Sequence, residues 1–487
     1  MKILFIAPEV SPFAKTGGLA DVAGSLPRAL RQLGHDVRII MPYYKAVEES
    51  RNPLRKGRKS VEVVIDGEPR KGLLRQSSVD LVTVYLIENR EYFDRDGLYG
   101  TAAGDYPDNA QRFGFFCRAA LEFLRRLDFR PDVLHLNDWQ TGLVPVLLRS
   151  ELKNDPFYNG IATLLTVHNL GYQGIFPPEV LSSLHLDPGL FSVKGMEYFG
   201  NVSFLKGGLL FADMINTVSP SYCREIQTPE LGFGFDGILR QRQGHVHGIL
   251  NGIDPKQWDP ALSSALPASY DAADLKGKSA DKRALQKELA LEIAAETPIV
   301  SMVTRLDTQK GLDLVEEAFE ELLKRDLQFI LLGTGEQKHM EFFEQIKDRY
   351  PGRVAVRLTF DDALAQRIYA GSDIFLMPSH YEPCGLGQLI ALRFGALPVV
   401  RRTGGLADTV VDPEEDAQNA NGFLFAEASA AALLAALDRA LALYPDTRAW
   451  RKMVRRGMTE DFSWNRSAQS YLDLYQKALE VRHAGRS

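Results

Sequence analysis

The sequence predicts an α/β protein made of two Rossmann-like domains with a ligand cleft between them. Along most of the 487 residues, short apolar runs alternate with segments of helical periodicity, which is typical of parallel sheets covered by helices. In addition, the stretch KTGGLAD at residues 15–21 recurs as RTGGLAD at residues 402–408. Each copy follows an apolar run and opens a helical pattern, so each predicts a strand, a glycine turn and a helix start.

Composition favours a soluble globular protein. The chain is 45% hydrophobic and 25% charged, with a net charge of -6, which argues against a nucleic-acid partner because phosphate contacts need a basic surface. The three cysteines lack the spacing of a metal site or disulfide framework. We find no signal peptide and no apolar run long enough to cross a membrane. We therefore expect a cytoplasmic protein with no membrane partner.

The first half of the chain predicts the elements of one domain. The expected strands are residues 2–7, 37–41, 61–66, 79–88, 132–136, 164–167 and 214–218, and the expected helices are residues 19–33, 109–127 and 206–211. Pro27 lies inside the first helix and is expected to kink or split it. Residues 43–60 are polar and predict a surface connection. Residues 89–108 form a long aromatic and glycine-rich loop, of a kind that tends to be functional.

The second half repeats the alternation. The expected strands are residues 299–303, 329–332, 354–358 and 374–377, and the expected helices are residues 282–291, 312–323, 337–349 and 363–370, followed by a mostly helical end from 430 to 479. Asn251-Gly252-Ile253-Asp254-Pro255 suits a crossing between domains. We expect an N-terminal domain over residues 1–250, a C-terminal domain over 251–460, and a C-terminal helix over 461–487 that packs back on the body.

Polar and cationic residues gather at the predicted strand ends of the first domain. Paired glycines let the backbone approach a ligand, and a helix N-terminus attracts an anion, to which Lys15 adds a full charge. Asp138 and His168 follow two further strands, where α/β sheets place ligands. A lone glycine pair is also ordinary turn chemistry, and a strand-end histidine is often structural. The recurrence of the glycine motif with a cation and an aspartate favours an anion site.

The second domain carries its own candidates. Arg305 and Lys310 lie five residues apart in a strand-to-helix loop and suit a diphosphate, although a solvated loop would also carry such residues. Glu382 precedes a glycine-containing turn into a helix, so its carboxylate and the turn's N–H groups could both reach the cleft. Cys384 has no sequence partner for a catalytic dyad and is interpreted as non-nucleophilic.

One further motif lies in the long loop. Asp94-Arg95-Asp96 resembles the paired aspartates that hold a metal in some sugar transferases. Nothing else nearby suggests a metal site, so we interpret this stretch as a solvated loop.

Taken together, these motifs resemble a known family. The segments KTGGLADV, NDWQTG, TVHN, NGID, RLDTQKG, YAGSD with PSHYEPCGLGQL, and RTGGLADTV stand in the order seen in bacterial glycogen synthases and plant starch synthases, over almost the whole chain. The resemblance implies a GT-B glycosyltransferase that moves glucose from ADP-glucose to the non-reducing end of an α-1,4-glucan with retention of configuration. The N-terminal domain would be the glucan side and the C-terminal domain the donor side. The resemblance implies no metal and no other cofactor.

The resemblance also implies residue roles. Lys15, Arg305 and Lys310 are similar to the family's diphosphate cations, His168 to a histidine against the transferred glucosyl group, and Glu382 to the acid that contacts this sugar. The remaining donor-pocket residues that the resemblance implies are Gly18, Asp21, Asp138, Asn251, Phe360, Cys384, Gly385, Leu386 and Gly405. Phe360 stands where an aromatic ring stacks on adenine. Related transferases often carry a second glutamate eight positions after the first, where this chain has Ile390.

Several alternatives remain open at the level of sequence. A sucrose- or trehalose-type synthase shares the fold and parts of the second domain, and a glucan-binding scaffold would not catalyse transfer at all. The three cations and Glu382 argue against the scaffold, and the first-domain KTGGLAD stretch argues against the other enzymes. Retention could use a covalent nucleophile or attack on the same face, guided by the leaving phosphate. We favour same-face attack, because no second carboxylate is placed as an obvious nucleophile.

Overall fold

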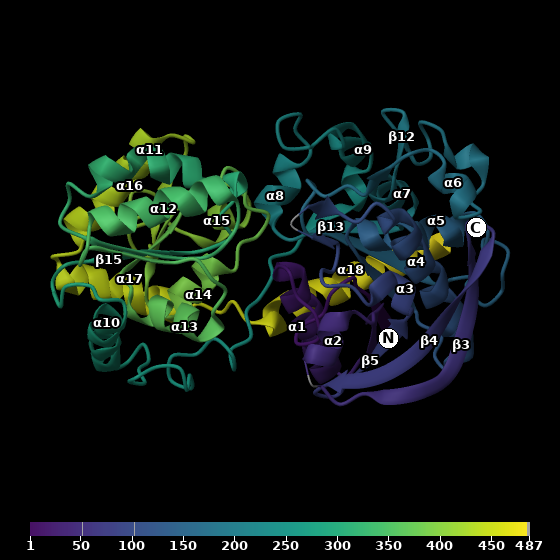
Figure 1. Cartoon of the computed structure of the whole chain (residues 1–487), viewed down its shortest axis with the longest axis horizontal. Coiled ribbons are helices and arrows are strands. Elements are labelled where there is room, and N and C mark those ends of the chain that lie inside the picture. The colour runs from purple at the N-terminus through teal and green to yellow at the C-terminus, as the bar shows by residue number, and fades with distance from the viewer. Residues whose placement is uncertain (51, 102, 485–487) are drawn as a thin grey trace. The chain divides into compact units, whose positions relative to one another are not determined.

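The computed structural model describes residues 1–50, 52–101 and 103–484, and the chain divides into two compact units. Unit 1 contains Met1–Val218, Cys223–Ile249 and the C-terminal segment from Trp464, whereas unit 2 contains Ser219–Tyr222 and Leu250–Ser463. Each unit is built around a sheet with helices packed on it (Figure 1). The predicted α/β fold with parallel sheets is confirmed.

The main sheet of unit 1 has nine strands in the order β14-β13-β9-β8-β1-β2-β5-β4-β3. The seven strands from β14 to β5 are parallel, and β4 and β3 are added antiparallel. Because helices cover both faces of a parallel sheet, its inner strands are apolar on both sides, as in β1, where Ile3, Leu4, Phe5 and Ile6 are fully buried. The strand bounds are β1 Lys2–Ile6, β2 Asp36–Pro42, β3 Arg55–Ile65, β4 Glu68–Val79, β5 Val82–Glu88, β8 Val133–Asn137, β9 Ala162–Val167, β13 Met214–Thr217 and β14 Val246–Gly248.

Helices and short strands complete unit 1. The helices are α1 Gly18–Gln32, α2 Lys45–Glu49, α3 Arg90–Phe93, α4 Asn109–Arg126, α5 Leu143–Arg149, α6 Val180–Ser183, α7 Phe204–Phe211, α9 Asp236–Gln241 and α18 Trp464–Ala484, and α8 Pro220–Glu225 lies where the chain changes unit. The short strands are β6 Gly100–Thr101, β7 Gly104–Asp105, β10 Ile175–Phe176, β11 Glu197–Tyr198 and β12 Asn201–Ser203. Helix α1 continues through Pro27, so the proline does not split it.

One prediction for this unit is wrong, and one strand was not predicted. The region 43–60 is not only a surface connection, because α2 lies within it and β3 starts at Arg55. In addition, the sequence analysis did not predict β4. Both strands belong to the long hairpin at the sheet edge (Figure 1), where one face meets solvent: residues 61–65 of β3 alternate between buried and exposed, whereas β4 is mostly polar or charged.

The sheet of unit 2 has six parallel strands in the order β17-β16-β15-β18-β19-β20. Their bounds are β15 Ile299–Val303, β16 Gln328–Leu332, β17 Val354–Arg357, β18 Ile374–Met377, β19 Leu397–Arg401 and β20 Phe423–Phe425. The helices are α10 Lys276–Glu288, α11 Leu312–Leu322, α12 Gln337–Arg349, α13 Asp362–Gly371, α14 Gly387–Arg393, α15 Gly404–Thr409, α16 Ala430–Leu443 and α17 Thr447–Thr459. Helices α11, α12 and α16 lie on one side of this sheet, and α13, α14 and α17 lie on the other (Figure 1).

A buried polar contact ties the C-terminal helix α18 to the sheet of unit 1. His135 of β8 is fully buried, and its Nδ1 lies 2.7 Å from the hydroxyl of Tyr475, while its Nε2 lies 2.6 Å from the hydroxyl of Thr166. Since that threonine hydroxyl donates to Asn216 Oδ1, it must accept from Nε2–H. Nδ1 therefore accepts from Tyr475. The imidazole is neutral and holds α18 against the sheet.

This contact makes the stability of unit 1 depend on pH. Burial holds the pKa of His135 well below its ordinary value, so the folded state does not take up a proton near pH 6 whereas the unfolded chain does. The contribution of this site to stability is therefore present above about pH 6.5 and is lost as the pH falls below it.

We expect Tyr475→Phe to destabilise unit 1 by about 1–3 kcal/mol, because it leaves the buried Nδ1 of His135 without a donor. Amide hydrogen exchange of α18 measures the loss locally, and urea unfolding measures it globally. Tyr350→Phe is the matched control, since its hydroxyl donates to Glu320 at 2.6 Å in an exposed pair of unit 2 and should cost less than about 0.5 kcal/mol. Equal exchange of α18 in both variants would contradict this account.

Candidate active site

The glycine turn of unit 1 lies between β1 and α1. Gly17 caps α1 and Gly18 is its first residue, so the backbone N–H groups of the first turn have no partner within the helix. Lys15 Nζ lies 2.9 Å from Asp21 Oδ1 in the first turn of the helix, and both side chains are partly exposed. The structure therefore brings together Lys15, Gly18 and Asp21. A cation beside a helix N-terminus is an environment suited to an anion.

Asp138 follows β8 and orients the loop that carries His168. Its Oδ1 accepts from the backbone N–H of His168 at 2.7 Å, and the N–H of Asn169 also donates to this carboxylate. Asp138 has a φ of 56° and a ψ of -174°, a backbone region that is largely restricted to glycine, so the chain is strained at this strand end. Burial raises the pKa of its carboxyl to about 7, and the nearby charge of Glu9 acts in the same direction. Asp138 and His168 thus form one polar cluster at the ends of β8 and β9.

His168 is held as a neutral imidazole. Its Nε2 lies 3.0 Å from Asn137 Oδ1, and the amide nitrogen of Asn137 donates elsewhere, to the carbonyl of Ile6. The amide oxygen can only accept, so Nε2 carries the hydrogen and Nδ1 carries the lone pair. Burial lowers the pKa of His168 to about 3. At neutral pH this side chain can donate and accept hydrogen bonds without bringing a charge.

In unit 2, the loop from Arg305 to Gly311 follows β15. Arg305 is about half exposed, and its guanidinium lies 3.3 Å from Asp307 Oδ2. The Asp307 side chain accepts from the N–H of Lys310 and caps the short 3-10 helix Thr308–Lys310. Gly311 has a φ of 71°, and a Cβ there would lie 2.2 Å from the carbonyl oxygen of Pro378. The glycine therefore lets this loop pack directly on the chain after β18.

Lys310 and Glu382 form a nearly buried ion pair. Lys310 Nζ lies 2.7 Å and 3.0 Å from the two carboxylate oxygens of Glu382, and Ser379 Oγ donates to the same carboxylate at 2.9 Å. Glu382 is only 5% exposed. The loops after β15 and β18 also share backbone contacts, since the N–H of His380 donates to the carbonyl of Gln309 at 2.9 Å. Thus two predicted residues, 72 positions apart, meet in one place.

The turn after Glu382 is tightly packed. Burial raises the pKa of the Cys384 thiol to about 12, which makes it a poor nucleophile, as the sequence indicates. The N–H of Asn251 donates to that sulfur, so Asn251 lies beside the turn. Within the described residues, Oδ1 of Asn251 has no hydrogen-bond partner although the residue is buried. Gly385 has a φ of 72°, and Leu386 caps α14.

The second copy of the glycine motif differs from the first in its packing. Gly405 donates from its N–H to the carbonyl of Glu382 at 3.1 Å, and a Cβ at Gly405 would lie 2.0 Å from the carbonyl oxygen of Cys384. Asp408 accepts from Ser221, and Arg402 pairs with Glu415, so this copy does not repeat the lysine–aspartate pair of the first. Its glycines support the Glu382 turn.

Phe360 lies in the loop between β17 and α13 and is 72% exposed. The ring is therefore not packed into the core of unit 2. The predicted stacking on adenine stays a prediction.

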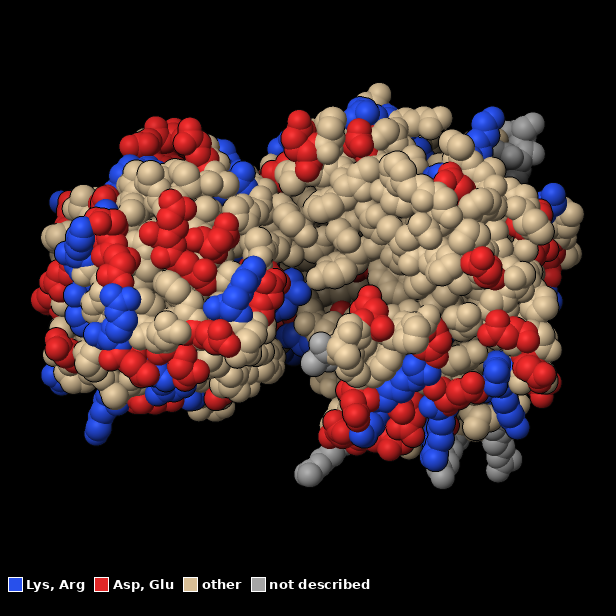
Figure 2. Space-filling model, turned by 45° about the horizontal axis from the view of Figure 1, so that its top comes forward, with Lys and Arg blue, Asp and Glu red and all other residues tan. Residues whose placement is uncertain are grey.

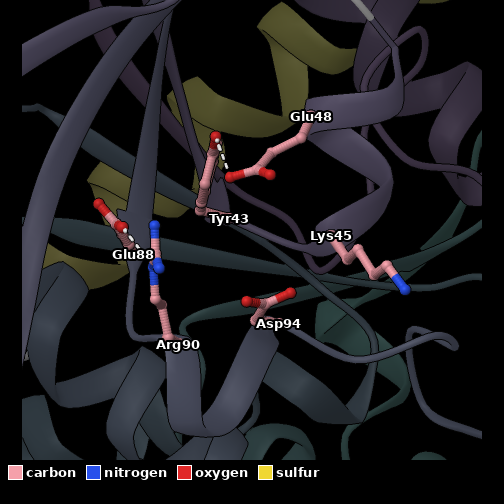
Figure 3. A pocket seen from close by; sticks show the side chains of 6 residues that line it. All are labelled: Tyr43, Lys45, Glu48, Glu88, Arg90 and Asp94. Carbon is pink, nitrogen blue, oxygen red and sulfur yellow. Dashed lines mark hydrogen bonds and ion pairs between the residues drawn. The ribbon is translucent and has the colours of Figure 1, made fainter.

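The loop with Asp94-Arg95-Asp96 borders a small charged hollow. Figure 3 shows its lining: Tyr43, Lys45, Glu48, Glu88, Arg90 and Asp94. Several of these polar groups have partners, since Lys45 contacts Asp96 at 2.6 Å, the Tyr43 hydroxyl donates to Glu48, and Glu88 contacts Arg75. Over residues 1–50, 52–101 and 103–484, no group of three or more His, Cys, Asp or Glu side chains is arranged to hold a metal ion. Across the same residues, no helix is both long and apolar enough to span a bilayer.

Two residues of this arrangement escaped the sequence analysis. Ser379 bonds the Glu382 carboxylate, and Glu9 bonds the turn that contains Thr16 and Gly17. Glu9 follows β1 as Asp138 follows β8, so a polar residue at a strand end was the available signal.

Comparison with known proteins finds matching family models and similar proteins over most of the chain. A model of the starch synthase catalytic domain matches residues 2–241, and a model of group 1 glycosyl transferases matches residues 286–456. The glycogen synthase of Syntrophotalea carbinolica is 59% identical over 99% of this chain and 100% of its own length. The catalytic domain of starch synthase IV from Arabidopsis thaliana, solved with ADP and acarbose, superimposes with a TM-score of 0.92 at 37% identity, covering 98% of this chain and 99% of its own.

A sucrose-phosphate synthase from Thermosynechococcus elongatus shares the fold, with a TM-score of 0.60 at 21% identity and 98% of each chain covered. The two family models show that the protein is a glycosyltransferase of two Rossmann-like domains, and the polar groups at the strand ends are consistent with this class. More narrowly, the chain belongs to the family of glycogen and starch synthases. The predicted family and its GT-B fold are confirmed.

The unequal packing of the two motif copies gives a test. We expect Gly405→Ala to destabilise unit 2 by roughly 1–3 kcal/mol or more, because the added methyl group would meet the backbone at Cys384. Gly17→Ala, in the first copy, should change stability by less than about 0.5 kcal/mol, since a Cβ there meets nothing within 4 Å. Thermal unfolding of the two variants measures the difference. Similar melting temperatures would mean that both copies have the same structural role.

Proposed function

We propose that the protein transfers glucose from ADP-glucose to the non-reducing end of an α-1,4-glucan with retention of anomeric configuration. The observation that supports this proposal is the Lys310–Glu382 pair, in which a cation suited to a diphosphate lies 2.7 Å from a buried carboxylate that could contact a sugar. The relatives suggest the substrate class, because they are glycogen synthases and a starch synthase solved with ADP and acarbose.

In this proposal, unit 2 binds the nucleotide sugar. Arg305 and Lys310 neutralise the diphosphate, and Lys310 can serve both the phosphate and Glu382 because an ammonium group has three hydrogens to donate. The unpartnered Oδ1 of Asn251 and the turn from Cys384 to Leu386 supply further polar groups around the donor. Phe360 would stack on adenine, and its exposure leaves the ring available.

The chemical step needs charge stabilisation at two points. Negative charge grows on the departing diphosphate, which the cations and helix N-termini stabilise, while positive charge grows on the sugar carbon, which Glu382 stabilises. We propose attack on the same face as the leaving phosphate. Lys15 and the neutral His168, oriented by Asp138, contribute to the same reaction from unit 1.

We propose that unit 1 binds the glucan acceptor. Its segment 171–203 exposes Tyr172, Phe191 and Phe199, which are 52%, 39% and 82% exposed. Figure 2 shows that the visible face over this part of the unit carries few charged side chains, whereas charges crowd the margin near the β3–β4 hairpin. A neutral polysaccharide suits an uncharged surface with aromatic rings that can lie against its sugar faces.

The function is tested by incubating the protein with glycogen and labelled ADP-glucose or UDP-glucose, followed by linkage analysis of the product. Label in new α-1,4 linkages from ADP-glucose is the expected result. Preference for UDP-glucose would overturn the donor. Transfer to fructose or a sugar phosphate instead of glycogen would indicate a sucrose- or trehalose-type synthase, and glycogen binding without transfer would indicate a scaffold.

We expect Glu382→Gln to lower transfer by roughly two orders of magnitude or more, while ADP affinity stays within a few-fold, because this charge acts mainly in the transition state. Turnover with ADP-glucose and calorimetric titration of ADP measure the two quantities. Glu288→Gln removes an exposed carboxylate that pairs with Arg367 in the same unit and should alter neither. Near-normal turnover of Glu382→Gln would refute the assignment of this residue.

A further inference from the structure

Glu9 is a buried carboxylate to which the proposed reaction gives no role. It follows β1 and is only 4% exposed. Its Oε2 accepts from the backbone N–H of Thr16 at 2.5 Å, and both of its oxygens lie 3.0–3.1 Å from the Thr16 hydroxyl. The N–H of Gly17 is a further donor to the same group. One carboxylate thus receives three donors from two consecutive residues of the glycine turn.

The two backbone donors among these have no acceptor within the helix. Thr16 and Gly17 immediately precede α1, whose first residue is Gly18, so their N–H groups lie outside the helical hydrogen-bond pattern. A short bridge between Val10 and Ala14 closes the chain between Glu9 and Lys15, with backbone bonds of 3.0 Å and 3.1 Å. Hydrogen bonds therefore restrict the backbone on both sides of Lys15: the Val10–Ala14 bridge before it, and the bonds from Thr16 and Gly17 to Glu9 after it.

Glu9 would be costly to bury for packing alone. Burial raises its pKa to about 7, against the opposing effect of the Thr16 and Gly17 donors. Its titratable neighbours include Asp21, Asp138, Tyr44 and Tyr99, all of which are acids. A buried carboxylate that lies among other acids, and that receives three donors from one glycine turn besides its interaction with the Tyr99 side chain, is suited to fixing that turn.

Asp138 provides a parallel in the same unit. Its carboxylate likewise accepts from consecutive backbone N–H groups, those of His168 and Asn169. Two strand ends of unit 1 therefore use the same device, a buried acid that fixes the backbone of a neighbouring loop next to a side chain of the predicted site.

We propose that Glu9 is a positioning residue for Lys15. By fixing the backbone at Thr16 and Gly17, it restricts where the Lys15 ammonium group can reach, so that the cation is preorganised for the anionic leaving group. The role of Lys15 in this inference rests on the proposed function. The contact between Glu9 and the turn does not.

The test uses Glu9→Gln, which is nearly isosteric. An amide offers one acceptor oxygen instead of two and turns an NH₂ group toward N–H donors, so the turn loses its support while the side-chain volume is kept. We expect amide hydrogen exchange in a peptide covering residues 10–20 to rise about 10-fold or more. We also expect kcat for glucosyl transfer to fall by roughly 10- to 100-fold, with KM for glycogen within about 3-fold.

Asp187→Asn is the matched control. Asp187 also accepts a backbone N–H, that of Gly189 at 2.8 Å, at the start of a short 3-10 helix in the same unit. This variant should change neither the exchange of residues 10–20 nor transfer. A second variant, Thr16→Val, keeps the carboxylate and removes only the hydroxyl donor, and we expect a smaller loss of kcat of about 3- to 10-fold. It provides the test if Glu9→Gln does not fold.

Each outcome is decisive. Raised exchange together with lowered kcat supports the positioning role. Lowered kcat with unchanged exchange would overturn it, because Glu9 would then act on substrate directly, and so would raised exchange with normal kcat. If the unmodified protein transfers no glucose to glycogen, the proposed function fails, and the exchange measurement still shows whether Glu9 fixes the turn.

Discussion

The parallel order of the strands is the constraint on which both sets of site residues depend. In a parallel sheet all carboxyl ends lie at one edge, so the residues that follow neighbouring strands become neighbours. In unit 1 this places Glu9, Asp138 and His168 after β1, β8 and β9, and in unit 2 it places Arg305 and Glu382 after β15 and β18. The apolar strands therefore do more than form a core, since their order assembles the polar groups.

The carboxylates at these edges are satisfied by hydrogen-bond donors of nearby loops, both backbone and side-chain. Glu9 and Asp138 accept hydrogen bonds from loop N–H groups, and Asp307 caps the turn before Gly311. Glu382 accepts a hydrogen bond from the Ser379 hydroxyl in addition to those from Lys310. Buried charge without such partners would be strongly destabilising. The same contacts that make these carboxylates tolerable also fix the loops that carry the candidate cations, so stability and preorganisation have one physical origin.

The two copies of the glycine motif have similar sequences but different structural roles. In the first copy, Gly17 has open space and Lys15 lies beside Asp21, next to the helix N-terminus. In the second, the corresponding glycines are pressed against the backbone of the Glu382 turn, and Arg402 pairs with Glu415. The local signal, a strand followed by a glycine turn and a helix, is the same in both. What differs is the neighbour that each turn meets.

By itself the sequence determined the α/β class, most inner strands and long helices, and the family, because apolar periodicity and motif order are local properties of the chain. It predicted only residues 61–66 of the region that forms β3, and it did not predict β4, whose residues are mostly polar or charged. Nor could it reveal which acids pair with which loops. Only the tertiary structure decided that Glu382 meets Lys310 across 72 residues and that Glu9 supports the Lys15 turn. These partners are set by strand order and loop packing, which no single stretch of sequence contains.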